Sequence, residues 1–143
     1  MSGAQALIAR HGLTPHPEGG WYRETWRAAA APGERAGGTA ILFLLEQGQR
    51  SHWHGVDADE LWLWHAGAPL ELSIGVARMT LDATNPQALV PAGEWQAAEA
   101  RLGWALVSCV VVPGFDFAGF TLAPPGWEPE ARDRIAAPLR GSQ

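Results

Sequence analysis

The stretch RSHWHGVDADELWLWHAG, residues 50–67, holds three of the five histidines and three of the eight tryptophans of the chain. Short aromatic and apolar runs with period-two alternation are typical of β-strands, and two such runs flank residues 55–59. We expect residues 55–59 to form a turn, so that one hairpin holds both strands. The histidines and carboxylates among the aromatic residues indicate that the same stretch is a candidate functional site.

The chemistry of this stretch depends on which side chains share a face. His52 and His54 are two residues apart, so on a strand both imidazoles point to the same side. The expected hairpin brings Glu60 close to both. Two histidines and one carboxylate on a rigid β scaffold form the facial set of non-haem iron sites, which also suits zinc, manganese or nickel. The alternative is that the histidines are hydrogen-bonded in a polar pocket without a metal.

The rest of the chain reads as short strands separated by glycine and proline. The sequence contains 17 glycines and 11 prolines, which divide it into short apolar segments. Further strand candidates are residues 37–47, 69–77, 88–99, 104–114 and 115–125. We expect one helix over residues 4–11 and another over 128–140. These elements predict an all-β sandwich or barrel with short peripheral helices at the termini.

Composition limits the class of protein. The chain has 143 residues, enough for one apolar core, so we expect a single domain over residues 1–143. We expect no membrane span, because no apolar run approaches ~20 residues. Residues 1–13 carry charges too early for a signal peptide, so we expect a cytoplasmic protein. The net charge of −5 and the lack of a basic cluster argue against nucleic-acid binding.

The reactive side chains are also limited. Cys109 is the single cysteine, so no internal disulfide can form, and its apolar surroundings favour a buried, inert thiol. All ten basic residues are arginines, which excludes Schiff-base chemistry on a lysine.

The N-terminal segment 15–28 contains a glycine pair followed by an expected strand that carries both aromatic and charged side chains. Gly19 and Gly20 allow a sharp fold or a close backbone approach. Beyond them, Tyr22, Glu24 and Trp26 share one face of an expected strand. Such a strand either lines a pocket or forms a charged edge that resists aggregation, and both interpretations stay open.

Three ordered motifs resemble the cupin superfamily. His52-x-His54, followed by Glu60 and then by six residues to Gly67, is similar to the first cupin motif, and PAGEWQ, residues 91–96, is similar to the second. HPEGGWYRET (16–25), the stretch 52–72 and VVPGFDFAGFTLA (111–123) together resemble one group of short, single-domain cupins long catalogued as having unknown function. The resemblance covers about residues 7–125. It implies a double-stranded β-helix, or jelly-roll barrel, that is often dimeric and holds a ligand or metal inside.

The sequence departs from the metal-binding cupin pattern in three places. His54 and Glu60 are separated by five residues instead of three or four, and Gly55 stands where this group commonly has a basic or polar residue. Gln96 replaces the histidine of the second motif. It can complete a four-ligand site with His52, His54 and Glu60, or it can hydrogen-bond a polar ligand in a metal-free pocket. The cofactor that the resemblance implies is one divalent ion, zinc, iron, manganese or nickel.

Several further residues are candidates for binding or catalysis. His54 can take and return a proton near neutral pH, and Glu60 beside it can fix its tautomer. Tyr22, the single tyrosine, can supply an acid if its strand reaches the barrel mouth. Trp62 and Trp64 follow Glu60 at strand period, so we expect them to form pocket walls. The remaining candidate ligand-binding residues are Ser51, Gln96, His16 and Glu18.

These residues favour a protein that acts on a small polar molecule, with no nucleic-acid or membrane partner, as a homodimer. The leading interpretation is an isomerase, epimerase or lyase that works by proton transfer. One alternative is a non-catalytic binding protein for a carbohydrate-like or other small polar ligand. Another is an iron-dependent dioxygenase, which requires a well-occupied metal site.

Overall fold

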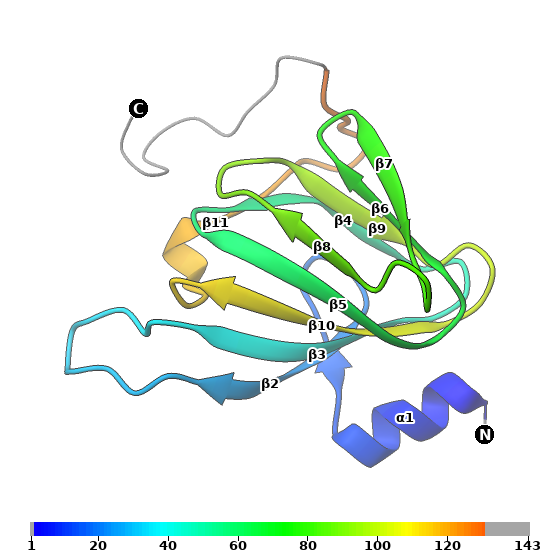
Figure 1. The fold of residues 1–143 in the computed structure, drawn as a ribbon, viewed down its shortest axis with the longest axis horizontal. Helices are drawn as coiled ribbons and strands as arrows, with labels where there is room; N and C mark the ends of the chain where they lie inside the picture. Colours follow the sequence, from blue (N-terminus) through cyan, green and yellow to red (C-terminus); the bar gives the residue numbers. More distant parts are fainter. Residues whose placement is uncertain (1, 131–143) are drawn as a thin grey trace.

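Two antiparallel β-sheets face each other in the computed structural model, which describes residues 2–130 (Figure 1). The six-stranded sheet has the order β1-β2-β3-β10-β5-β8, and the five-stranded sheet has the order β11-β4-β9-β6-β7. Two packed antiparallel sheets are the all-β architecture that the sequence predicts. The strands are β1 Thr14–Pro15, β2 Trp21–Arg27, β3 Thr39–Leu45, β4 Arg50–Val56, β5 Asp59–Gly67, β6 Leu70–Ile74, β7 Ala77–Leu81, β8 Gln87–Val90, β9 Gln96–Glu99, β10 Ala105–Val112 and β11 Phe120–Leu122.

One α-helix, α1 (Gly3–His11), lies at the N-terminus, close to the helix expected over residues 4–11. Ser2 and Gln5 form a reciprocal capping box, and Gly12 ends the helix in the left-handed conformation. Ala4 packs with Leu44 and Leu106 on the outer face of the six-stranded sheet. The second expected helix, over 128–140, falls largely outside the described residues.

The stretch 50–67 forms two strands that belong to different sheets. β4 pairs with β9 and β11, whereas β5 pairs with β10 and β8. The expected hairpin is therefore wrong, because the chain crosses from one sheet to the other at Asp57 and Ala58. The crossing still places the two strands on opposite walls of the space between the sheets.

Apolar side chains fill one end of that space. Trp62 lies at 1% exposure against Phe43, with their ring centroids 6.0 Å apart, and Leu72 packs against the same cluster from the other sheet. Burying aromatic and leucine side chains of this size is worth about 1.5–3 kcal/mol each. The packed end therefore holds the sheets together and leaves the opposite end free for a cavity.

Two β-bulges change the side-chain alternation of the strands around that cavity. In β4, three steps along the chain from Ser51 to His54 match only two steps along β9, from Ala98 to Gln96. In β2, the pairing with β3 shifts in the same way between Glu24 and Trp26. Each extra residue reverses which side chains face inward beyond the bulge.

Among the described residues, no helix is long and apolar enough to cross a membrane.

Candidate functional site

A cavity of about 610 Å³ opens between the two sheets. Its walls combine an apolar set from both sheets with a group of titratable side chains. The titratable residues that line it are His16, Glu18, Tyr22, Glu24, Arg27, Glu34, Arg35, His54, Glu60, Cys109 and Asp116. The apolar lining includes Ile41, Phe43, Val56, Val111, Phe115, Phe117 and Phe120.

Glu18 reaches the cavity because the segment before β2 folds tightly against β4. The backbone carbonyl of Glu18 accepts a hydrogen bond of 2.7 Å from the His52 amide, which fixes the segment to the strand. Gly19 has a φ of 109°, and a Cβ at that position would collide with the backbone carbonyl of Arg50. A glycine is therefore required there, both for the conformation and for the close approach. The positive φ of Gly19 and its contact with the Arg50 carbonyl thus explain why the sequence has a glycine at this position.

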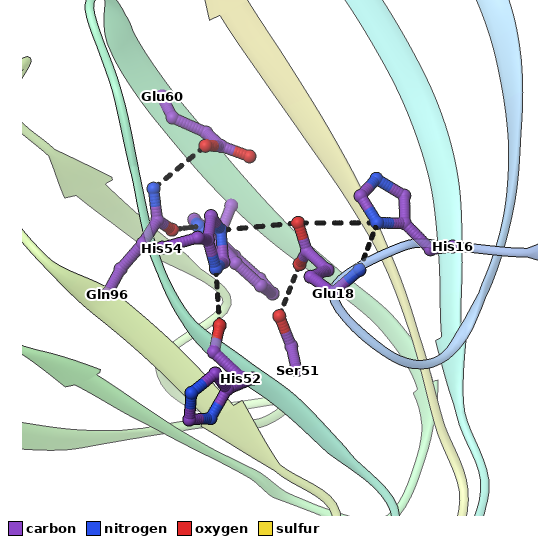
Figure 2. A network of polar contacts seen from close by, with 8 residues as sticks. His16, Glu18, Ser51, His52, His54, Glu60 and Gln96 are labelled. Carbon is purple, nitrogen blue, oxygen red and sulfur yellow. Dashed lines mark hydrogen bonds and ion pairs between the residues drawn. The ribbon is translucent and has the colours of Figure 1, made fainter. Parts of the chain in front are cut away.

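The carboxyl of Glu18 lies between two imidazoles, as Figure 2 shows. Its Oε1 is 3.4 Å from His54 Nε2 and 3.4 Å from His16 Nδ1. Its Oε2 accepts a hydrogen bond from the Ser51 hydroxyl. Burial raises the pKa of this carboxyl to about 8, against a smaller opposing effect of the Ser51 hydrogen bond. Glu18 is therefore a neutral carboxylic acid at pH 7.

Hydrogen bonds fix the tautomers of both imidazoles. His54 Nδ1 lies 2.7 Å from the His52 carbonyl, so Nδ1 carries the proton and neutral His54 presents a lone pair at Nε2. His16 Nδ1 accepts from the Glu18 amide at 3.1 Å, so its lone pair is engaged there and its ring proton lies on Nε2. Burial lowers the pKa of His54 and, with a contribution from His54, lowers the pKa of His16 to about 4. Both rings are therefore neutral, and His54 is the one that presents a lone pair to Glu18.

These assignments leave one proton to be shared by Glu18 and His54. The lone pair of His54 Nε2 faces Glu18 Oε1, and that contact is favourable when the carboxyl carries the proton. The cluster thus joins an acid and a base at the edge of one cavity, with His16 beside them. Such an arrangement can donate a proton to a bound molecule and accept one from it.

Glu60 forms the opposite polar wall. Its Oε1 accepts from Gln96 Nε2 at 2.9 Å, and Gln96 Oε1 accepts from Trp62 Nε1 at 2.8 Å. Burial raises the pKa of Glu60, while the neighbouring His54 opposes that rise. The Cys109 thiol is hydrogen-bonded to Glu60, and burial raises the pKa of this thiol well above its usual value. Cys109 is thus buried, as the sequence predicts, and it also lines the cavity.

The structure brings together five of the residues singled out in the sequence. His16, Glu18, Tyr22, His54 and Glu60 all line the cavity.

Three more candidates lie behind this lining. Ser51 bonds Glu18, Gln96 bonds Glu60, and Trp62 bonds Gln96. Trp62 is part of the packed core and not of the cavity wall. Trp64 is also outside the wall, and its indole donates to the Ala68 carbonyl. Phenylalanines therefore form the aromatic lining where tryptophans were expected, because the tryptophans of β5 continue into the filled end of the barrel.

His52 does not join His54 in the cavity. Its Nε2 lies 2.9 Å from the Pro124 carbonyl, and Figure 2 shows its ring turned away from the other labelled side chains. The extra residue in β4 is the physical reason, because it places Ser51 and His54 on the inner face and His52 outside it. The expectation that both imidazoles share a side is wrong for this strand.

The four residues expected to hold a metal do not fit a common ion. His52 is directed to a backbone carbonyl, and the amide oxygen of Gln96 already accepts from Trp62. Within residues 2–130, no group of three or more His, Cys, Asp or Glu side chains is arranged to hold a metal ion. The described site is therefore a hydrogen-bonded acid–base cluster.

Two arginines at the cavity were not anticipated from the sequence. Arg27 faces inward because of the bulge in β2, and it donates to Glu24 at 2.7 Å. Arg35 lies in the loop between β2 and β3 and makes two hydrogen bonds with Asp57, of 2.7 and 2.9 Å. Nothing in the local sequence around Arg35 indicates this partner, which lies 22 residues away.

The fold and the lining define a cupin barrel, and the sequence comparison identifies the family. The chain matches the model of the Cupin superfamily (DUF985) over residues 5–123, so it belongs to that family. The expected cupin resemblance and the jelly-roll fold class are thereby confirmed. No curated protein matches the chain significantly in sequence.

Solved structures agree with this assignment. The chain is similar to a crystallised protein from Shewanella oneidensis, with 36% identity, a TM-score of 0.77, and coverage of 86% of this chain and 85% of that one. It is also similar to a hypothetical protein from Leishmania major, with 30% identity, a TM-score of 0.76, and coverage of 85% and 88%. A cupin-2 domain from Rhodospirillum rubrum shares the fold at 14% identity and a TM-score of 0.58, over 78% of this chain and 70% of that one.

Proposed function

We propose that this cupin is a small-molecule enzyme of the isomerase, epimerase or lyase type that acts by proton transfer. One observation carries the proposal: the neutral carboxyl of Glu18 faces the Nε2 lone pair of neutral His54 at the edge of the cavity. Acid and base must both be in their active protonation states for such chemistry. The raised pKa of Glu18 and the lowered pKa of His54, both caused by burial, support that condition at pH 7.

The proposed reaction acts on a carbon next to a carbonyl group. Glu18 donates its proton to the carbonyl oxygen, while His54 Nε2 takes the proton from the neighbouring carbon, which yields an enol and an imidazolium. An isomer forms when that proton goes to the adjacent carbon and an enol hydroxyl returns a proton to Glu18. An epimer forms when a proton from solvent reaches the opposite face of the enol, while the enol hydroxyl returns its proton to Glu18 and His54 loses its proton to solvent. Expulsion of a leaving group from the next carbon completes a lyase reaction. Tyr22, whose ring centroid lies 4.5 Å from that of His16, is a second hydroxyl acid on the same wall.

The test is exchange of carbon-bound hydrogen in D₂O. Wild-type protein is incubated with a panel of α-hydroxy ketones and aldoses, and deuterium incorporation is followed by NMR. We expect enzyme-dependent exchange that Glu18→Gln and His54→Asn each lower by about 10²–10⁴-fold. His65→Ala is the matched control, because His65 contacts Ser108 outside the cavity and should leave exchange unchanged.

The same experiment distinguishes the proposed enzyme from a non-catalytic binding protein. Exchange that is equal in wild type and Glu18→Gln would overturn the proposed acid. Ligand-induced stabilisation without exchange by any compound would instead favour the non-catalytic binding protein. An iron-dependent dioxygenase would need a metal-ligand set that residues 2–130 do not form.

We also propose a homodimer. β1 covers only Tyr22 and Trp21 of the edge strand β2, and Trp26 further along that strand is 51% exposed. Sedimentation velocity would measure the mass, and a monomer at all concentrations would contradict the proposal. The cytoplasmic location expected from the N-terminal sequence stays a prediction, to be checked by cell fractionation.

A further inference from the structure

The cavity has two chemically different ends, and this difference bears on the ligand. Glu18, His54 and Glu60 make up the buried polar end. Phe115, Phe117 and Phe120 contact one another edge to face, with ring centroids 4.7 to 5.9 Å apart. Phe117 is 57% exposed, although it also lines the cavity. An exposed aromatic cluster beside a cavity is a surface suited to an apolar or aromatic group.

The polar end offers no positive charge to a ligand. His16 and His54 are neutral, and the two carboxyls Glu18 and Glu60 are acids whose pKa values burial raises. A carboxylate or phosphate placed there would lose its hydration without gaining a counter-charge. Burying such an ion without a partner costs several kcal/mol. A hydroxyl or carbonyl group instead finds both donors and acceptors.

The arginines that line the cavity already have carboxylate partners. Arg27 donates to Glu24 at 2.7 Å, and both terminal nitrogens of Arg35 bond Asp57. Glu34 and Asp116 add two more carboxylates to the lining. An anionic ligand would therefore meet an excess of negative charge before it reached the polar end.

We propose that the cavity binds an uncharged molecule with an aromatic or apolar group at one end and hydroxyl or carbonyl groups at the other. The inference rests on the proposed function, because it names the ligand class of the same cavity. The apolar group lies against Phe117 and its neighbours, and the hydroxyl or carbonyl group bonds Glu18 and His54. An ammonium group beside Glu18 would first have to ionise that carboxyl, whose pKa burial raises to about 8, whereas a hydroxyl uses the hydrogen bonds as they stand.

Three compounds with one carbon skeleton test this proposal at neutral pH. Styrene glycol is uncharged, mandelate replaces its terminal alcohol with a carboxylate, and phenylethanolamine replaces it with an ammonium group. Dissociation constants are measured by isothermal titration calorimetry with the full chain. We expect styrene glycol to bind about tenfold or more tightly than either charged compound.

Matched variants locate the binding. Phe117→Ala should weaken styrene glycol binding several-fold, since it removes the aromatic contact from an exposed position that the fold does not need. Leu102→Ala removes a side chain that is 74% exposed and outside the cavity, so binding should not change. Equal weakening by both variants would overturn the placement of the apolar group.

The outcomes separate this inference from the proposed function. Equal or tighter binding of mandelate or phenylethanolamine would overturn the uncharged class, and so would the absence of binding by all three compounds. Preference for styrene glycol without hydrogen exchange in any α-hydroxy ketone would sustain the ligand class and refute the enzyme. Exchange confined to phosphorylated or carboxylated substrates would sustain the enzyme and refute the ligand class.

Discussion

Glu18 Oε1 lies 3.4 Å from His54 Nε2, and this contact joins the segment before β2 to the inner face of β4. The two residues are 36 positions apart in the chain, and the backbone hydrogen bond from His52 to Glu18 holds their segments in register. The acid of the proposed reaction thus comes from the segment that leads into β2 of the six-stranded sheet, and the base comes from β4 of the five-stranded sheet.

The first prediction concerns stability and pH. Between its ordinary pKa of 4.5 and its folded pKa of about 8, Glu18 holds a proton that the unfolded chain has lost. The contribution of protonated Glu18 to the free energy of unfolding is therefore fully present below pH 4.5, and it falls as the pH rises to about 8. His16 acts in the opposite direction, but only between about 4 and 6.5. Above that window, Glu18 and Glu60 both make the protein less stable as the pH rises.

Glu18→Gln isolates this effect. We expect the free energy of unfolding of the wild type to fall by about 2 kcal/mol between pH 6.5 and 8. The free energy of unfolding of Glu18→Gln should fall clearly less over the same range. Urea denaturation at several pH values measures both. Glu99→Gln on β9, outside the cavity, is the control and should keep the wild-type slope. A variant slope equal to that of the wild type would show that Glu18 is not the titrating group.

The second prediction concerns Ser51. Its hydroxyl donates to Glu18, and this hydrogen bond lowers the pKa of the carboxyl. Ser51→Ala should therefore raise the pKa of Glu18 above about 8 and cost about 1–2 kcal/mol of stability. Carbon-13 NMR of the glutamate carboxyls follows the titration. Ser108→Ala, which removes a hydroxyl that is hydrogen-bonded to His65 outside the cavity, should leave the Glu18 titration in place.

The third prediction concerns Gly19. Gly19→Ala imposes a Cβ on a residue with φ of 109° and against the Arg50 carbonyl, so we expect a loss of at least about 2 kcal/mol. Gly33→Ala is the matched control, because its φ of 81° is also left-handed but the space around it is open. We expect it to cost only about 1 kcal/mol. Equal losses would mean that the contact with β4 contributes nothing.

The fourth prediction concerns metal. His52 is hydrogen-bonded to the Pro124 carbonyl, and the amide oxygen of Gln96 accepts a hydrogen bond from Trp62. We therefore expect the protein to bind no stoichiometric zinc, nickel, manganese or iron after equilibration with each ion. Mass spectrometry of the metal content in wild type, His52→Ala and His54→Ala measures this. Stoichiometric metal in the wild type that disappears in His54→Ala would contradict the hydrogen-bonded site described here.

The sequence predicts much of the fold because the strands are short, regular and well bounded. β5 lies inside the stretch 50–67 whose alternation indicates strands, and β3 and β10 lie inside the predicted runs 37–47 and 104–114. The segment 69–77 was expected as one strand, but Gly75 and Val76 form a turn and β7 begins at Ala77. The polar residues of β7 carry little strand signal, so pairing with β6 decides its conformation.

The site is less predictable, since it depends on features that alternation cannot encode. The motif residues His54 and Glu60 do line the cavity, as do His16, Glu18 and Tyr22. Their roles in catalysis stay proposals. The bulge in β4 follows from pairing with β9, and the partner of Arg35 follows from how a long loop folds back. Neither pairing has a local signal, so the position of His52 and the arginine contacts could not be read from the chain.

The extra residue in β4 also affects how this chain should be aligned with its relatives. An alignment anchored on the two histidines treats His52 and His54 as equivalent site residues, although His52 lies outside the cavity in this chain. The inner neighbour of His54 is Ser51, three positions earlier. A search for proteins with the same site should therefore match a serine and a histidine at that interval, together with a glutamate just before a glycine pair.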